Sequence, residues 1–365
     1  MKTVVFSGHS RPIKDIQFNT EDDLLFTGSA DRYVTLWSTE TSERIGTYYH
    51  DAAITCMYPT KDSKYLISAD NFGGIYIWEI STGKRLAKID DSHLGIMSTC
   101  TSLSFGVSDR EVLSNFIFRG KGTTHNDFKI FNVDDVLKMM PTITPNSEGI
   151  SLASFSSKKF PHKIVERRTN NKINISRLMN NNKQVLCACE NGLVQIIDID
   201  KNEIIKEKQL HKEGSKILDL HLTEKEELAI SSGKDSKSVL FDPENLDIIN
   251  VFEVDNPIRN INSGKISPLF NPELSEKDQI RHCFIGGGQD SGSVTFTSSK
   301  EGGFEILIYD MILGEEVGSI SGHFSPINSI AVSNSGRLVV SGGEEATVRV
   351  HLLNEEYVNL KEYDF

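Results

Sequence analysis

The sequence has little of what marks disulfide-rich, metal-binding or membrane-spanning proteins. Its 365 residues include five cysteines, and no two of them form a C-x-x-C pair. Cys187 and Cys189 stand two apart in an apolar run with no second Cys/His pair nearby, so we expect buried thiols and no zinc site. The chain also lacks a basic-then-apolar leader after Met1 and any apolar run of about 18 residues. These absences predict no membrane span and a cytoplasmic location.

The sequence is also short of positive charge. Lysine and arginine number 39 against 51 acidic residues, which gives a net charge of -12 at pH 7. A protein that grips nucleic acid through phosphates needs a basic surface, so we expect no direct sequence-specific nucleic-acid binding. Residues 158–177 are a basic exception, which we interpret as the solvated edge of an insertion.

Helical periodicity is nearly missing. Short runs of Val, Ile, Phe and Tyr alternate with Gly, Asp, Asn and Ser turns, and only Asp134–Met140 suggests a helical turn. So many short strands are typical of a sandwich, a barrel or a propeller.

A repeat decides among these folds. The segment "FSGHSRPIKDIQFN" runs into "DLLFTGSADRYVTLWS", and "ISGHFSPINSIAVS" runs into "RLVVSGGEEATVRVHL". Both place an acidic turn 22 residues after a Gly-His pair and then an alternating strand. A period near 40–45 residues with Gly-His and Trp-Asp signals is that of a four-stranded propeller blade. The frame recurs in seven units, whose third strands end near Trp37, Trp78, Phe131, Ile197, Phe241, Tyr309 and His351.

The prediction is therefore an all-β, seven-bladed WD-repeat β-propeller that forms one domain over residues 1–365. Residues 2–6 precede the first unit and should complete the seventh blade beside 347–352, because an open sheet edge would otherwise remain. Stretches near 140–158 and 265–281 are rich in Pro, Ser, Asn and charge, and we expect exposed insertions there.

The repeated histidines are predicted to be structural. In the first unit His9 and Asp31 fall in turns on one rim, where the imidazole can bond the carboxylate, with Ser29 and Trp37 completing a buried network. His211 and His323 begin equivalent units, as do His50 and His93. The second unit departs from the pattern because Asp70 precedes Trp78 by eight residues, so we expect a longer hairpin there and do not extend the network to this unit.

The glycine-rich stretch "IGGGQDSGSVTFTSSK" does not fit a phosphate-binding loop. Neither G-x-x-x-x-G-K-[ST] nor G-x-G-x-x-G is present, and a strand is predicted to follow instead of a helix. The glycines are better explained by backbone crowding in the second strand of blade six. The candidate nucleophiles Ser298 and Cys283 have no His and carboxylate at motif spacing, so we expect no enzyme, no metal and no cofactor.

Two carboxylates of the fifth unit are candidate partner-binding residues. Asp219 lies beside the innermost strand, and Asp235 tips the adjacent hairpin on the same rim, where both could receive a basic side chain from a docked helix. Two alternatives stay open at this point. Asp235 holds the place of Asp31 and could bond His211, while Asp15 holds the place of Asp219, which could make that acid a feature of the repeat.

The glycine segment also carries a family resemblance. "GGGQDSGSVTFTSS", followed by "GHFSPINSIAVSNSGRLVVSGGEEATVRVH", resembles the i subunit of eukaryotic translation initiation factor three, as does "GHSRPIKDIQFNTEDDLLFTGSAD" near the start. The resemblance covers nearly the whole chain, and the family carries acids at the positions of Asp219 and Asp235. It implies a non-catalytic scaffold that docks the b and g subunits and reaches the small ribosomal subunit through the complex. The alternative is another WD-repeat adaptor, such as a substrate receptor of a ubiquitin ligase.

Overall fold

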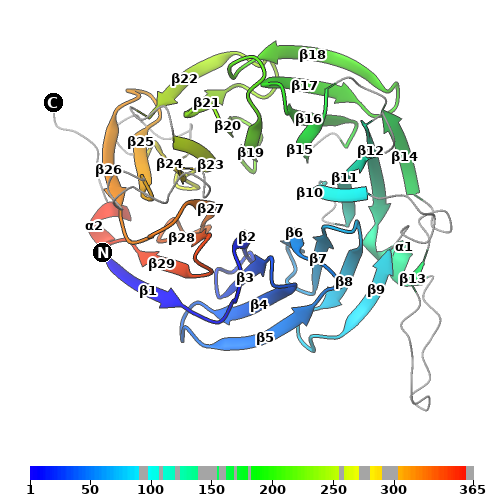
Figure 1. The fold of residues 1–365 in the computed structure, drawn as a ribbon, viewed down its shortest axis with the longest axis horizontal. Helices are drawn as coiled ribbons and strands as arrows, with labels where there is room; N and C mark the ends of the chain where they lie inside the picture. Colours follow the sequence, from blue (N-terminus) through cyan, green and yellow to red (C-terminus); the bar gives the residue numbers. More distant parts are fainter. Residues whose placement is uncertain are drawn as a thin grey trace.

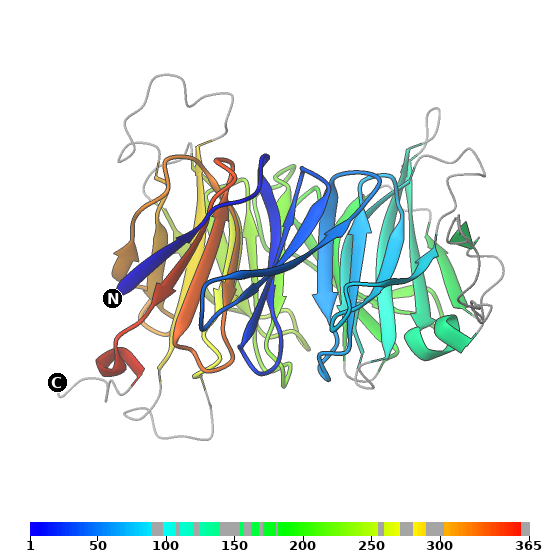
Figure 2. The same ribbon diagram turned by 90° about the horizontal axis from the view of Figure 1, so that it is seen from below.

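A computed structural model places the strands in seven sheets around a central axis, as a seven-bladed β-propeller (Figure 1). Seen from the side, the strands run between the two rims of a disc (Figure 2). The structure describes residues 1–89, 98–106, 110–119, 124–138, 154–155, 162–167, 171–179, 182–254, 259–270, 280–289 and 303–358. The seven predicted third-strand ends all fall on the third strand of a blade.

The strands of the first three blades follow one another from the innermost position outward. Blade 1 consists of β2 (Ile13–Phe18), β3 (Leu24–Ser29), β4 (Tyr33–Ser38) and β5 (Arg44–Tyr49). Blade 2 consists of β6 (Ile54–Pro59), β7 (Tyr65–Asp70), β8 (Ile75–Glu79), β9 (Arg85–Ile89) and β13 (Ser154–Phe155). Blade 3 consists of β10 (Ser98–Phe105), β11 (Glu111–Arg119), β12 (Thr124–Asn132) and β14 (His162–Arg167).

The remaining blades follow the same order. Blade 4 consists of β15 (Ile173–Leu178), β16 (Gln184–Cys189), β17 (Leu193–Asp198) and β18 (Glu203–Gln209). Blade 5 consists of β19 (Ile217–Leu222), β20 (Ala229–Gly233), β21 (Lys237–Phe241) and β22 (Ile248–Glu253). Blade 6 consists of β23 (Arg259–Ile266), β24 (His282–Gln289), β25 (Ile306–Asp310) and β26 (Glu316–Ile320), and blade 7 of β27 (Ile327–Val332), β28 (Leu338–Gly343), β29 (Val348–Leu352) and β1 (Lys2–Phe6).

The position of a strand in its blade decides its burial. The second strand of blade 4, β16, is buried at five of its six residues, whereas the outermost strand β18 is exposed at all but one of its seven. Middle strands pack between two neighbouring blades and therefore read as continuous apolar runs. Outermost strands have one free edge and tolerate charged residues. The core consequently lies between blades, as where Phe6 of blade 7 stacks on Trp37 of blade 1 at 4.9 Å.

The ring closes as the sequence predicts. Strand β1 pairs antiparallel with β29, from Lys2 opposite Leu352 to Phe6 opposite Val348. The two ends of the chain thus share blade 7, and no open edge is left between its third strand and solvent.

A repeated asparagine contact also fastens neighbouring blades. Each asparagine stands at the irregularity of an innermost strand and donates its amide to the first carbonyl of the next innermost strand. The bonds run from Asn174 to Ile217, from Asn262 to Ile327 and from Asn328 to Ile13, at 2.9, 2.7 and 2.9 Å. The third of them joins blade 7 to blade 1 and completes the ring.

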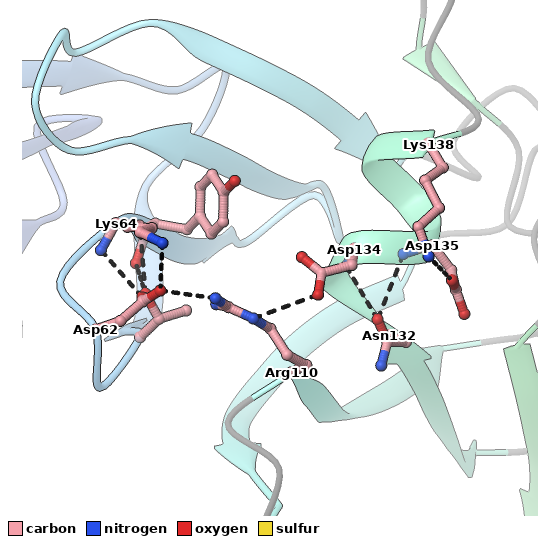
Figure 3. Close-up of polar contacts among 9 residues, drawn as sticks. Asp62, Lys64, Arg110, Asn132, Asp134, Asp135 and Lys138 are labelled. Atoms are coloured by element: carbon pink, nitrogen blue, oxygen red, sulfur yellow. Dashed lines mark hydrogen bonds and ion pairs between the residues drawn. The ribbon is translucent and has the colours of Figure 1, made fainter.

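The first insertion contributes ordered elements at the outside of blades 2 and 3. Strand β13 pairs in parallel with β9, so part of the predicted 140–158 insertion adds a fifth strand to blade 2. Helix α1 (Val133–Lys138) precedes it and begins at Asn132, whose side-chain oxygen accepts from the amides of Asp134 and Asp135. The Arg110 guanidinium lies between Asp62 of blade 2, at 2.6 Å, and Asp134, at 3.4 Å (Figure 3). This bridge fixes α1 against the neighbouring blade. Residues 139–153 lie outside the described residues.

The second insertion differs from the sequence prediction, and a short helix follows the last blade. Strand β23 extends to Ile266, so Lys265 belongs to blade 6 and not to an insertion at 265–281; residues 271–279 are outside the described part. A short helix, α2 (Glu355–Val358), follows blade 7. Tyr357 of α2 bonds His282 of blade 6 at 2.9 Å, which ties the tail to the ring.

The glycine run of blade 6 is explained by crowding. Gly287 lies so near the neighbouring strand β23 that an added Cβ would collide with the carbonyl oxygen of Asn260. At Gly288 the backbone φ is +148°, and a Cβ would stand 2.6 Å from the Phe304 ring. Both glycines belong to β24, as predicted, while the hairpin at 290–302 with Ser298 lies outside the described residues.

Candidate functional site

The first blade contains a buried chain of polar contacts at one rim. His9 Nδ1 lies 2.9 Å from the Asp31 carboxylate, and His9 Nε2 lies 2.8 Å from the hydroxyl of Thr27. The indole N–H of Trp37 donates to the same hydroxyl at 2.9 Å. A neutral imidazole that donates from Nδ1 and accepts at Nε2 satisfies every member of this chain. Burial raises the Asp31 pKa, but the hydrogen bond from His9 and those from nearby amides hold it below its usual value.

The predicted place of Ser29 in this network needs correction. Its hydroxyl donates to the Arg11 carbonyl at 2.8 Å and accepts from the Asp31 amide at 3.1 Å, so it shapes the turn and does not touch the histidine. Thr27 takes the central position instead. Side chains alternate along a strand, so Thr27 and Ser29 share a face, and sequence spacing alone did not separate them.

Blades 5 and 7 repeat the arrangement with different residues. His211 lies 2.9 Å from both Asp235 and the Ser231 hydroxyl. His323 lies 2.7 Å from Glu345 and 2.8 Å from the Ser341 hydroxyl. Neither third strand offers a tryptophan, so the hydroxyl ends each chain.

Blade 2 departs from the pattern, as predicted. His50 and Trp78 meet at the Ser68 hydroxyl, at 2.6 and 2.9 Å, but the Asp70 carboxylate instead accepts from the Tyr76 hydroxyl at 2.9 Å. Burial lowers the pKa of His50 to about 3, so its ring is neutral. The equivalent His93 lies outside the described residues.

These networks have the order carboxylate, imidazole, hydroxyl that acyl-transfer enzymes use. Their hydroxyls are nevertheless out of reach, because Thr27, Ser231 and Ser341 are 0% exposed. No substrate carbonyl could approach them, so the geometry favours a structural role. Among the described residues, no group of three or more His, Cys, Asp or Glu side chains could hold a metal ion. Within the same residues, no helix is long and apolar enough to span a membrane.

Asp219 lies at the boundary between blades 5 and 6, with its carboxylate already occupied. Oδ2 accepts from the Lys265 ammonium at 2.7 Å, the Ser263 hydroxyl at 2.7 Å and the Gly264 amide at 3.2 Å. Burial raises the pKa of this carboxyl, but the charges of Lys265 and Arg177 outweigh burial and hold it at about 2. Within the chain this carboxylate thus forms a charge pair with Lys265.

Asp235 also has internal partners. Its side chain is 2% exposed and accepts from His211 and from the Lys212 amide at 2.8 Å. Burial opposes ionisation, while the hydrogen bond and charge of His211 lower its pKa. The two carboxylates of blade 5 thus have separate sets of internal partners. For Asp235 the sequence left open either partner binding or a bond to His211, and these contacts favour the bond to His211.

The central channel is lined by charges from several blades. Asp15, Arg177, Asp219 and Lys265 contribute to a cavity of about 140 Å³. Asp15 accepts from the Met57 amide of blade 2 at 2.8 Å, so it joins neighbouring blades as Asp219 does. Burial raises the pKa of Asp15 to about 6, against the opposing effects of that hydrogen bond and of the two cations. The repeat interpretation of Asp219 thus has structural support.

An exposed apolar surface, the blade 5–6 patch, spans the outside of blades 5 and 6. It consists of Ile248, Ile249, Ile312 and Leu313, which are 44%, 49%, 56% and 53% exposed. Asn250 fixes its two halves together by donating to the Met311 and Ile312 carbonyls, both at 3.1 Å. Apolar side chains gathered on a surface mark interaction sites more often than single exposed ones.

Sequence reasoning missed both this patch and Lys265. The doublets "II" and "IL" were readable signals, because two successive apolar residues on an outermost strand or its turn cannot both face the blade interior. Lys265 gave no such signal, since its partner is 46 positions away.

Comparisons with known proteins agree with this fold. A family model described as "WD domain, G-beta repeat" matches residues 314–351, and one described as "TEP-1 C-terminal beta-propeller" matches residues 9–80. The crystal structure of the Myceliophteria thermophila Cps50 (Swd1) β-propeller domain superposes with a TM-score of 0.69 over 95% of this chain and 98% of that one, at 14% identity. At that identity the match shows the fold alone.

Curated relatives match nearly the whole chain. Eukaryotic translation initiation factor 3 subunit I of Schizosaccharomyces pombe is 29% identical, with 99% of both chains covered. The same subunit of Candida glabrata is 28% identical over 100% of this chain and 96% of its own, and that of Xenopus tropicalis is 27% identical over 99% of each. The chain is thus a WD-repeat propeller similar to subunit I from end to end.

Proposed function

We propose that this chain is a non-catalytic scaffold subunit of a translation initiation factor three complex in the cytoplasm. Its similarity to subunit I across the full length supports a role in the initiation complex. We further propose that it docks the b and g subunits and contacts the small ribosomal subunit only through that complex. The curated relatives favour this function over a ubiquitin-ligase receptor.

The blade 5–6 patch is the observation that carries the docking proposal. Its apolar residues lie exposed together on one surface, and an amphipathic helix buries such a stripe with its i, i+3 and i+4 residues. Acidic side chains flank the patch, since Asp247 precedes Ile248 and Glu315 follows Leu313 by two positions, and both are exposed. The expected partner is therefore a helix with an apolar stripe and basic flanks, which we assign to the b subunit's C-terminal segment.

Asp219 and Asp235 take a different part in this proposal from the one predicted. The Asp219 carboxylate joins blade 5 to blade 6 through Lys265, and the Asp235 carboxylate holds the rim of blade 5 through His211. They would thus support the partner surface from beneath rather than contact the helix. Substitution of either acid should affect binding only together with stability.

The test is copurification of the tagged full chain from its native cell, followed by mass spectrometry. The wild type should retain the b and g subunits. Ile249→Asp should lose the b subunit by about tenfold or more, because a charge replaces a buried anchor. Ile205→Asp is the matched control, since Ile205 stands at the same irregularity of the outermost strand in blade 4 and is 44% exposed.

Two results would contradict the proposal. Absence of initiation-factor subunits from the wild-type sample would remove the proposed function. Normal retention of the b subunit by Ile249→Asp would remove the patch as its docking site. Thermal melting of each variant, compared with the wild type, identifies a loss that comes from unfolding.

A further inference from the structure

The outer surface of blade 1 carries a hollow of about 420 Å³ next to the strand that closes the ring. One wall is the backbone of Gly8, which follows β1, and the other is formed by β4 and β5, including Tyr33, Thr35, Arg44 and Thr47. In Figure 1, β5 lies on the opposite side of the ring from β22 of the blade 5–6 patch. The hollow is therefore a separate surface.

Two threonines form its floor. Thr35 and Thr47 stand opposite one another on β4 and β5, and Thr35 is only 3% exposed although it lines the hollow. Within the part of the chain that the structure describes, neither hydroxyl makes a hydrogen bond. Thr47 is exposed, and neither hydroxyl belongs to the buried atoms that lack a partner, so both are open to a ligand that accepts from them.

The cationic group of the hollow is also free. The Arg44 guanidinium forms no ion pair or hydrogen bond with any described residue, although the chain has 51 acids for 39 bases. Its guanidinium lies beside Gly8, within 3.9 Å of where a Cβ of that residue would stand. This places the guanidinium at the wall of the hollow, next to the backbone of position 8.

Asp31 also lines the hollow, but its carboxylate forms no ion pair with Arg44. Asp31 is 7% exposed at its side chain and accepts from His9, the Ser10 amide and the Tyr33 amide. The oxygens of this carboxylate are thus already hydrogen-bonded within blade 1. What remains open to a ligand is a set of donors: a guanidinium and two threonine hydroxyls.

The rim supplies apolar contact. Ile45 is 56% exposed and Tyr33 40% exposed, and the ring of Tyr33 lies 5.4 Å from that of Tyr49. We propose that this hollow binds an extended segment of a partner protein through one aspartate or glutamate side chain flanked by an apolar residue. The carboxylate accepts from Arg44 and the threonine hydroxyls, while the neighbouring residue covers Ile45 and Tyr33.

Selection from a display library of random 12-residue peptides tests the proposal on the full chain. The library is first depleted on Arg44→Glu and then selected on the wild type. The surviving peptides should carry Asp or Glu beside an aliphatic or aromatic residue. Fluorescence anisotropy of synthetic copies should show about tenfold or greater loss of affinity for Arg44→Glu, and a similar loss when the acid is replaced by its amide.

Arg85→Glu is the matched control. Arg85 begins the outermost strand of blade 2 opposite Trp78, as Arg44 does opposite Trp37 in blade 1, but it does not line the hollow. Its variant should bind the selected peptides within about twofold of the wild type. The proposal is overturned if no peptide survives depletion, if the survivors lack acidic residues, or if Arg85→Glu weakens them as much as Arg44→Glu. Circular dichroism confirms that both variants are folded.

Discussion

The Lys265 ammonium lies 2.7 Å from the Asp219 carboxylate and joins the innermost strands of blades 6 and 5. Both side chains are largely buried, at 15% and 12% exposure. Removal of one partner of such a pair leaves the other charge desolvated and uncompensated, which makes the contact one on which the ring depends.

Asp219→Lys should therefore destabilise the protein. The expected cost is about 3 kcal/mol or more of unfolding free energy, since two ammonium groups would face each other at the blade boundary. Urea denaturation measures it. Asp247→Lys on the surface is the control, because Asp247 is 73% exposed in its pair with Lys208 and should cost at most about 1 kcal/mol. Equal effects of the two variants would contradict the importance given to the buried pair.

Asp15→Asn should change how stability depends on pH. Burial raises the Asp15 pKa from 3.8 to about 6, so the folded state holds this proton more tightly than the unfolded state. The resulting stability is fully present below about pH 4 and is lost as the pH rises to about 6. The asparagine variant lacks this loss. Its unfolding free energy relative to the wild type should thus increase between about pH 4 and 6 and then stay constant, and a pH-independent difference would refute the assignment.

Thr27→Val should cost more stability than Ser29→Ala. Valine removes the hydroxyl that lies between His9 and Trp37, so an imidazole nitrogen and an indole N–H lose their buried partner. We expect about 2 kcal/mol or more for this change and about 1 kcal/mol for the serine change, which frees only turn contacts. Thermal and urea unfolding of both variants decide the matter. The reverse ranking would restore Ser29 to the centre of the network.

Gly287→Ala should destabilise blade 6, whereas Gly318→Ala should not. An alanine Cβ at 287 would collide with the Asn260 carbonyl oxygen. This oxygen belongs to the backbone, so it cannot move aside as a flexible side chain could. Overpacking of this kind costs about 1–3 kcal/mol. Gly318 stands on the outermost strand of the same blade with no atom within 4 Å of an added Cβ, so its variant is an internal control. Equal melting temperatures for the two would argue against crowding as the reason for the glycine run.

The sequence alone determined the fold and the histidine–carboxylate pairs of blades 1, 5 and 7. Seven blades, the closure by residues 2–6, the departure of blade 2 and the strand assignment of the GGG run all follow from periodicity and turn chemistry. These signals are local, because each blade repeats one pattern of burial whatever its neighbours are. The same locality made His9, His211 and His323 readable, since each bonds a carboxylate of its own blade.

Only the tertiary structure decided which groups meet between blades. Asp219 looked like an open acceptor in the sequence, but its partner Lys265 comes from the next blade and was assigned to an insertion. The fifth strand of blade 2, β13, begins 65 residues after the end of its neighbour β9, and no local sequence pattern predicts that pairing. The hollow at Arg44 likewise needs Gly8 and β5 side by side. Contacts of this kind depend on how neighbouring sheets face each other, which is set by packing around the whole ring and not by the spacing of residues along one strand.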